Sequence, residues 1–332
     1  MKISPIAFLK YTLFFLLGIA ITYYLFKTQY HSNFPDDLAN ADKTWILITA
    51  ITVMIPHYLR ALRWKLLIQP LKKSKTSTLN VFNAIMIGYF ANLALPRAGE
   101  IMRCAWLSKK EDLSTVSLIG TVITERIIDL FALGIIVLMG LGLYFEIILH
   151  FTQGIDFKTL ILSKIYLFIG LILILLIGTY LIFKIFTSQN KLAIKIKGFI
   201  NQLKEGLLSL KKMEQPFLFS FYTIAIWFFY VFSTYCGFKM LQETSHLTLS
   251  NALLTIIGGS FGMIAPIQGG IGAFHFMVSQ CLILLNVSAG PALVYATILH
   301  AIQTLLVIIF GILALIIGIV YQPKHKVDVT KS

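Results

Sequence analysis

The sequence predicts an all-α, polytopic integral membrane protein with about six full spans and two re-entrant hairpins. The chain of 332 residues is 58% hydrophobic and only 13% charged, which excludes an ordinary soluble domain. Several apolar stretches are long enough to cross about 30 Å of hydrocarbon as helices. Two other apolar stretches contain polar, turn-forming residues, which a bilayer tolerates only where protein or a water-filled cavity surrounds the backbone.

The predicted full spans are uninterrupted apolar runs with few charges. They lie near Phe8–Phe26, Thr44–Leu62, Val116–Phe145, Thr159–Phe186, Phe217–Met240 and Pro291–Tyr321. The first run resembles a signal peptide, because Lys2 and Lys10 flank its start. Its length and its lack of a small-residue cleavage site favour a retained membrane helix.

The interrupted segments lie near Leu79–Leu107 and Leu249–Leu285. The first holds Pro96 and Gly99, and the second holds Pro266 followed by a glycine run, all of which favour turns. We expect each segment to enter the membrane, turn and leave on the same side. Paired broken segments in corresponding halves are typical of transporters.

The distribution of basic residues favours a cytoplasmic N-terminus and a cytoplasmic C-terminus. With this layout, the outside segments hold few of the 28 lysines and arginines, namely Lys27, Lys43, Lys158, Lys164 and Lys239. The two halves, residues 1–150 and 156–322, then form an inverted repeat of span, span, hairpin and span. The alternatives are a coincidence, or two hairpins that are really full spans.

The linker between the halves, residues 187–215, is predicted to be an amphipathic helix on the cytoplasmic leaflet. Apolar residues recur at helical spacing, and lysines occupy the remaining surface. The alternative is a connector that packs only on protein. Residues 1–332 form one membrane domain. The net charge of +14 is explained by topogenic residues, so we expect no nucleic acid partner.

Three ionisable residues stand inside the third predicted span, where charge is costly and usually functional: Glu125, Arg126 and Asp129. Glu125 and Asp129 share a helix face, and Arg126 lies three residues before Asp129. The functional interpretation is a polar cluster that grips a lipid head group or relays protons. The structural alternative is an internal ion pair that locks neighbouring helices together.

The first hairpin contributes Asn92, Arg97, Glu100 and Arg103. Glu100 is within reach of either arginine if this part is helical, and Asn92 is suited to cap exposed backbone. Arginine matches phosphate oxygens with paired donors, which suits a phospholipid or polyprenyl-phosphate head group. The alternative is simple positive charge at the cytoplasmic interface, especially for Arg103.

The second hairpin contributes Gln268, Gly269 and Gly270, and its glycines permit a tight turn and close approach to a ligand. Free backbone N–H groups at the start of the returning helix attract anions. His275 and His300 stand in apolar surroundings. A lone histidine is usually a packing residue, but two on adjacent elements can pair, bind a ligand or change charge near neutral pH.

Three ordered motifs carry a family resemblance: Asn92…Pro96-Arg97-x-Gly99-Glu100-x-x-Arg103, then Glu125-Arg126-x-x-Asp129, then Pro266-x-x-Gly269-Gly270-x-Gly272. The chain resembles the lysylphosphatidylglycerol synthase transmembrane family, which includes the flippase-like membrane region of the multiple peptide resistance factor. The resemblance implies a bacterial inner-membrane protein that moves or handles a polar lipid. Relatives commonly have a glutamate where His275 stands and an arginine near His300.

The leading hypothesis is a stand-alone lipid translocase that binds a polar head group in an intramembrane cavity. The alternatives are a membrane-embedded lipid-modifying transferase and a non-catalytic partner of a separate lipid-modifying enzyme. No catalytic motif is recognisable, and we expect no aminoacyltransferase domain, enzyme activity, cofactor or metal. The expected partners are anionic or lipid-linked membrane lipids, with a homo-oligomer or a lipid-modifying enzyme as further candidates. The predicted head-group residues are Asn92, Arg97, Glu100, Arg103, Glu125, Arg126, Asp129, Gln268, Gly269, Gly270, His275 and His300.

Overall fold

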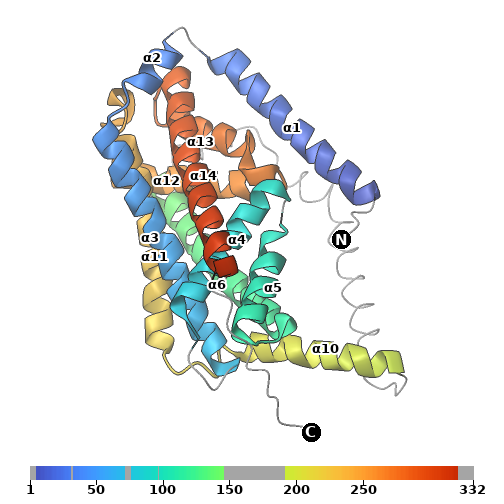
Figure 1. Cartoon of the computed structure of the whole chain (residues 1–332). Helices are drawn as coiled ribbons and strands as arrows, with labels where there is room; N and C mark the ends of the chain where they lie inside the picture. The colour runs from blue at the N-terminus through green and yellow to red at the C-terminus, as the bar shows by residue number, and fades with distance from the viewer. Residues whose placement is uncertain (1–4, 31–32, 72–75, 96, 146–190, 321–332) are drawn as a thin grey trace, which may run out of the picture.

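The computed structural model describes residues 5–30, 33–71, 76–95, 97–145 and 191–320, and these residues form helices joined by turns, without a β-strand (Figure 1). The long helices lie side by side in a bundle. Besides them, the described chain contains short helices at the connections: α2 (Phe34–Ala39), η1 (Gln69–Leu71) and η2 (Gln242–Thr244). The predicted all-α class is confirmed.

Within the described residues, four helices are long and apolar enough to cross a membrane. They are α3 (Lys43–Ile68, continued by η1), α6 (Thr115–Leu143), α11 (Pro216–Phe238) and α14 (Ala289–Val320). Each begins within two residues of a predicted span. Helix α1 (Pro5–Gln29) contains the first predicted span, and the predicted span Thr159–Phe186 lies outside the described residues.

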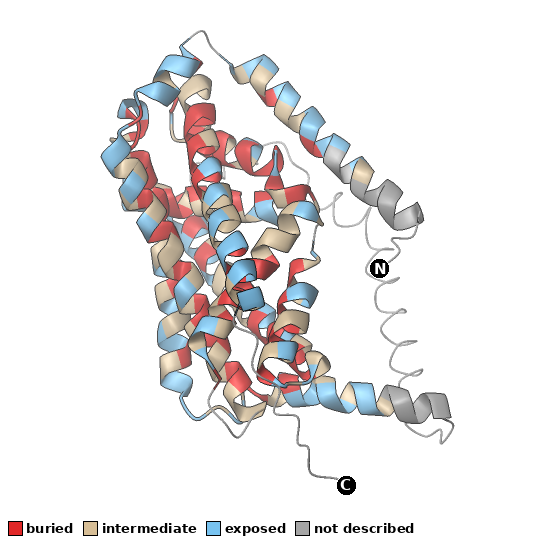
Figure 2. Ribbon diagram, in the orientation of Figure 1, coloured by how far each residue is buried: buried red, intermediate tan, exposed pale blue. Residues whose placement is uncertain are grey.

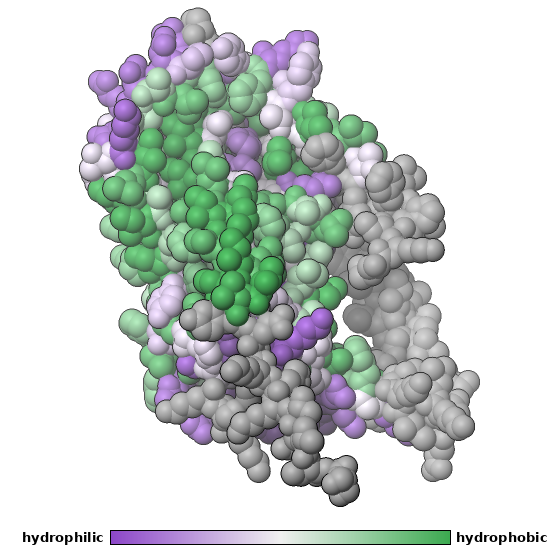
Figure 3. Space-filling model, viewed as in Figure 1, coloured by the Kyte–Doolittle hydropathy of each residue, from purple (hydrophilic) through white to green (hydrophobic). Residues whose placement is uncertain are grey.

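Surface hydropathy supports insertion in a bilayer. Figure 3 shows a broad hydrophobic area across the middle of the visible face, with hydrophilic residues gathered toward its two ends. Buried residues gather where the long helices pack on one another, and the outward faces are exposed (Figure 2). Exposed large side chains on these faces include Leu130, Phe131 and Ile135 of α6. A polytopic membrane protein therefore follows from the structure as well as from the composition.

Each interrupted segment forms two short helices that pack against each other. The first gives α4 (Thr78–Ala94) and α5 (Gly99–Glu111), and the second gives α12 (Leu249–Ile264) and α13 (Ala273–Leu284), joined by η3 (Gln268–Gly270). Gly99 is required for the first pairing, because a Cβ atom there would lie 2.2 Å from the Gly88 carbonyl oxygen. Entry and exit on one side of the membrane stays a prediction.

The two halves pack in a reciprocal way. Helix α3 runs along α11, its counterpart in the predicted repeat. Helix α4 of the first hairpin packs on α14, and α12 of the second hairpin packs on α6. This exchange of partners is what a two-fold relationship between the halves produces. The inverted repeat itself stays a prediction.

Helix α10 (Lys191–Leu208) lies across the ends of the long helices (Figure 1). It falls within the predicted amphipathic linker, and it packs on the first turns of α6. The crossing is very close, because a Cβ atom on Gly206 would lie 2.1 Å from the Ser117 carbonyl oxygen. The Thr124 hydroxyl donates to the Leu207 carbonyl oxygen at 3.4 Å, so α10 contacts α6 one residue before Glu125.

Candidate functional site

Six charged side chains from three helices meet inside the bundle, and we call this group the charge cluster. Helix α3 supplies two arginines, α5 supplies one, and α6 supplies two carboxylates and a further arginine: Arg60, Arg63, Arg103, Glu125, Arg126 and Asp129. Five of the side chains are at most 12% exposed, and Arg126 is 42% exposed. Such a group inside apolar helices is costly unless its charges are paired.

Glu125 is the centre of the charge cluster and is completely buried. Its Oε1 atom accepts from Arg60 Nη1 at 2.8 Å and from Arg126 Nη2 at 2.6 Å. Its Oε2 atom lies 3.4 Å from Arg103 Nη1. One carboxylate therefore contacts arginines from α3, α5 and α6.

Asp129 lies one turn further along α6 and binds the same face of α3. Its Oδ1 atom accepts from Arg63 Nη2 at 2.6 Å, and its Oδ2 atom accepts from Arg60 Nη1 at 2.9 Å. Arg126 Nη2 lies 3.4 Å from Oδ2 of Asp129. The predicted common face of Glu125 and Asp129, and the predicted Arg126–Asp129 proximity, are both confirmed.

Neighbouring polar and aromatic side chains hold the arginines in place. The Trp64 indole lies under the Arg103 guanidinium at 4.5 Å and donates to the Thr121 hydroxyl at 2.9 Å. From α11, Tyr230 lies 3.3 Å from Arg60 Nη2, and Thr223 lies 3.3 Å from Arg63 Nη1. The charge cluster is thereby connected to the second half of the chain.

The charge cluster carries more positive than negative charge. Four guanidinium groups face two carboxylates, an excess of two positive charges among the described residues. Several buried N–H groups also have no hydrogen-bond partner in this part of the chain: Nε of Arg60, Nε of Arg63, and both Nε and Nη2 of Arg103. Unpaired buried donors on cations are expensive, and an anion removes that cost.

Sequence reasoning missed Arg60 and Arg63. We expected the span to end at Leu62, and neither arginine was among the predicted head-group residues. That interpretation is wrong, because α3 continues to Ile68 and buries both side chains in ion pairs. Their spacing of three residues, which places them on one helix face, was the available signal.

The other predicted residues of the first hairpin lie outside the charge cluster. Arg97 is exposed, has a left-handed φ of 64°, and donates from Nη2 to the Ile264 carbonyl oxygen at 3.2 Å. Glu100 forms no ion pair with either predicted arginine in the described part of the chain. Asn92 Oδ1 accepts from the Gly99 N–H at 2.7 Å, so it holds α4 to the start of α5 as a capping residue.

The two predicted histidines of the second hairpin do come together. Their rings lie 4.7 Å apart in an edge-to-face arrangement. The His300 Nε2–H group donates to the Gly269 carbonyl oxygen at 2.9 Å, and His275 Nδ1 accepts from the Gly272 N–H at 3.3 Å. The Gly272 N–H is therefore not free for an anion, contrary to the expectation for this returning helix.

Three glycines give the second hairpin its turn. Gly269, Gly270 and Gly272 have φ values of 59°, 75° and 82°, which residues with a Cβ atom rarely adopt. Gln268 is 9% exposed within the same turn. The Arg97–Ile264 hydrogen bond places the two hairpin turns in contact. The candidate residues thus form two groups, the charge cluster and the hairpin turns.

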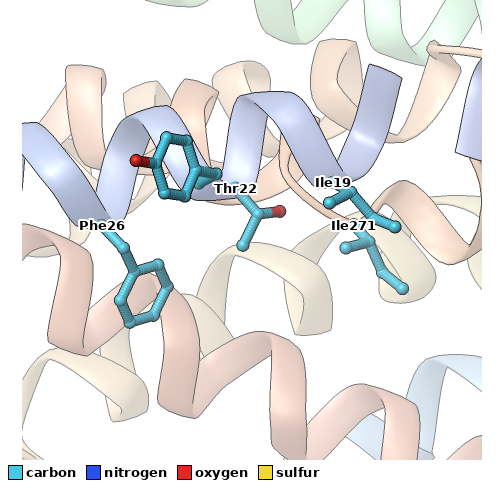
Figure 4. Close-up of a pocket in the computed structure, with 5 residues that line it drawn as sticks. Ile19, Thr22, Phe26 and Ile271 are labelled. Atoms are coloured by element: carbon cyan, nitrogen blue, oxygen red, sulfur yellow. The ribbon is translucent and has the colours of Figure 1, made fainter. Parts of the chain in front are cut away.

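An open apolar cavity of about 290 Å³ lies between α1 and the second hairpin (Figure 4). Its lining residues are Ile19, Thr22, Tyr23, Phe26 and Ile271. No member of the charge cluster lines this cavity. Its apolar wall is suited to hydrocarbon, and it offers no charged group to a polar ligand.

Comparison with known proteins assigns the family. The model of the lysylphosphatidylglycerol synthase TM region matches residues 10–311. The chain belongs to this family. All members of the charge cluster and both hairpin turns fall inside the matched region. Family membership and the apolar helices together identify an integral membrane protein.

The chain is also similar to an archaeal membrane protein. The UPF0104 membrane protein MJ1595 of Methanocaldococcus jannaschii is 28% identical over 171 residues, which covers 48% of this chain and 47% of the relative. The chain thus spans about half the length of the curated relative that it matches. No solved structure matches the chain.

Proposed function

We propose that this protein is a lipid translocase whose charge cluster binds the anionic head group of a membrane lipid. One observation carries the proposal: among the described residues, four arginines face two carboxylates inside a bundle whose long helices are apolar enough to span a membrane. Ionisable residues at such positions usually mark a substrate pathway. The family's association with lysylphosphatidylglycerol synthase supports a lipid as the substrate.

The energetic argument concerns the excess charge. A buried cation without a counterion costs several kcal/mol or more. Glu125 and Asp129 neutralise two arginines, and the remaining positive charge needs an anion. Arginine binds phosphate through paired, charge-assisted hydrogen bonds, which are about twice as strong as neutral ones. A lipid phosphate therefore suits the Nε and Nη2 donors of Arg103, which have no hydrogen-bond partner among the described residues.

The fold offers a route to alternating access. The charge cluster combines α3, α5 and α6 with Tyr230 and Thr223 of α11, and the two hairpin turns meet at Arg97 and Ile264. Rocking of one half against the other is the common mechanism in repeat-built transporters. We place both termini in the cytoplasm and the protein in the cytoplasmic membrane, following the basic residues.

Liposome reconstitution tests the proposal. Purified protein is inserted into vesicles with a fluorescent anionic phospholipid, and a membrane-impermeant quencher reports the fraction that changes leaflet. Arg103→Gln should reduce the flipping rate at least about tenfold, equivalent to about 1.4 kcal/mol. Lys109→Gln removes an exposed charge from the same helix and should leave the rate unchanged.

Equal flipping by Arg103→Gln and the unaltered protein, with both folded, would contradict the assigned site. Mass spectrometry of the recovered lipid separates translocation from chemistry. The proposal expects lipid of unchanged mass. A covalently altered lipid that forms only with active protein would favour the membrane transferase instead.

A further inference from the structure

We infer that the head group bound by the charge cluster carries two negative charges on one phosphate, as in a lipid phosphomonoester. This inference rests on the proposed function and adds the class of substrate. The charge balance carries it, since four guanidinium groups and two carboxylates leave two positive charges to be neutralised. A phosphodiester has one negative charge and leaves one positive charge of the charge cluster unbalanced.

The chemistry of the phosphate decides between these classes. A phosphomonoester has a second pKa of about 6. At neutral pH it carries a charge of about −1.5 to −2 and has three strong acceptor oxygens. The charge cluster offers Nε and Nη2 of Arg103 together with Nε of Arg60 and Nε of Arg63 as donors without a partner in the described residues. Two of these donors belong to Arg103, and a monoester keeps a further acceptor oxygen beyond the two free oxygens of a diester for a neighbouring arginine.

The arrangement around Arg126 indicates that the phosphate is attached to a lipid. Arg126 is the most exposed member of the charge cluster, with 42% of its side chain accessible. Around it, α6 presents exposed apolar side chains among the described residues: Ile123, Ile127, Leu130 and Phe131. A lipid fits this arrangement if its phosphate enters the charge cluster beside Arg126 and its hydrocarbon lies along the apolar face of α6.

Binding measurements on the full-length protein in nanodiscs test the inference. The probes are short-chain phosphatidic acid as monoester, phosphatidylglycerol with the same chains as diester, and inorganic phosphate. Near pH 8 we expect phosphatidic acid to bind at least about tenfold more tightly than phosphatidylglycerol, the effect of one further charge-assisted contact. We expect a similar margin over inorganic phosphate, which has the charge but lacks the hydrocarbon that would contact α6. Near pH 5, where the monoester carries about one charge, its advantage over the diester should largely disappear.

A variant gives an independent readout. Arg103→Gln lowers the excess charge by one and should bring the affinities for monoester and diester within about threefold of each other. Lys109→Gln, on the same helix but exposed, should keep the preference. The pH comparison uses unaltered protein, so it does not depend on the folding of any variant.

The outcomes separate this inference from the proposed function. Equal affinity for both lipids at both pH values would overturn the doubly charged substrate and leave an anionic-lipid translocase standing. Inorganic phosphate that binds as tightly as phosphatidic acid would overturn the lipid attachment. If neither lipid binds, both the proposed translocase and the doubly charged head group are overturned.

Discussion

Arg60 and Asp129 are 69 positions apart in the sequence, yet Nη1 of Arg60 lies 2.9 Å from Oδ2 of Asp129. The same nitrogen lies 2.8 Å from Oε1 of Glu125, and the other terminal nitrogen of Arg60 contacts Tyr230 of α11. One guanidinium therefore connects α3, α6 and α11. A change in this group alters helix packing as well as charge.

Glu125→Gln should destabilise the fold strongly. The substitution leaves the four arginines of the charge cluster, three of them buried, facing one carboxylate. Loss of one partner of a buried ion pair costs about 3–5 kcal/mol. The measurement is the apparent melting temperature in detergent micelles. Glu205→Gln alters an exposed glutamate on α10 and should change stability by at most about 0.5 kcal/mol. Equal melting temperatures for the two variants would contradict the central position of Glu125.

Arg63 and Asp129 should be energetically coupled. Their 2.6 Å contact is buried, and each group compensates the charge of the other. In a double-mutant cycle with Arg63→Gln and Asp129→Asn, we expect a coupling free energy of about 1–3 kcal/mol. The free energy of unfolding in mixed micelles is measured for the unaltered protein, the two single variants and the double variant. Additive effects of the two substitutions would show that the contact adds no stability.

Sequence reasoning found α6 and its carboxylates, because charges within a long apolar run are easily recognised. It missed Arg60 and Arg63, since a run of basic residues follows them and has the composition of a cytoplasmic loop. Whether such a residue is topogenic or buried depends on where the helix ends. Helix α3 continues to Ile68, and its last turns are packed in the core through the buried side chains of Trp64, Leu67 and Ile68.

The crossing of α10 on α6 gives a test with a matched control. Gly206→Leu should separate the helices, because a Cβ atom at Gly206 meets the Ser117 carbonyl oxygen at 2.1 Å. The control Gly198→Leu lies on the same helix, and no atom of the described residues lies within 4 Å of the Cβ position there. Hydrogen–deuterium exchange should rise across α10 by about tenfold or more only for Gly206→Leu, as expected for a lost packing contact. Equal exchange in both variants would mean that α10 is held elsewhere.

The histidine pair was recognisable in the sequence only as two separate polar residues. Its geometry depends on the Gly269 carbonyl, which a left-handed turn aims at His300. His300→Leu leaves this carbonyl unpaired and should cost about 1–3 kcal/mol. His300→Gln keeps a donor and should retain most of the stability. The comparison is made by thermal melting, and equal loss in both variants would show that the ring contact with His275 matters more than the hydrogen bond.

The predicted re-entrant hairpins can be tested by the side of the membrane on which their ends lie. Both ends of the first hairpin should face the cytoplasm, and both ends of the second should face the opposite side. Single cysteines at Ser77 and Lys109 should react with an impermeant maleimide only from the cytoplasmic side, and those at Gln242 and Ser288 only from outside. The background replaces the buried native residues Cys104, Cys236 and Cys281 with alanine. Labelling of Ser77 and Lys109 positions from opposite sides would show that the first segment crosses fully.

The most direct test of the central claim is a cryo-electron microscopy map of the protein in nanodiscs with short-chain phosphatidic acid. We predict density for a phosphate within hydrogen-bond distance, about 3 Å, of the Arg103 guanidinium, with hydrocarbon density along the exposed face of α6. Lipid density confined to the outer surface, with protein groups alone satisfying Arg103, would contradict a head-group site at the charge cluster.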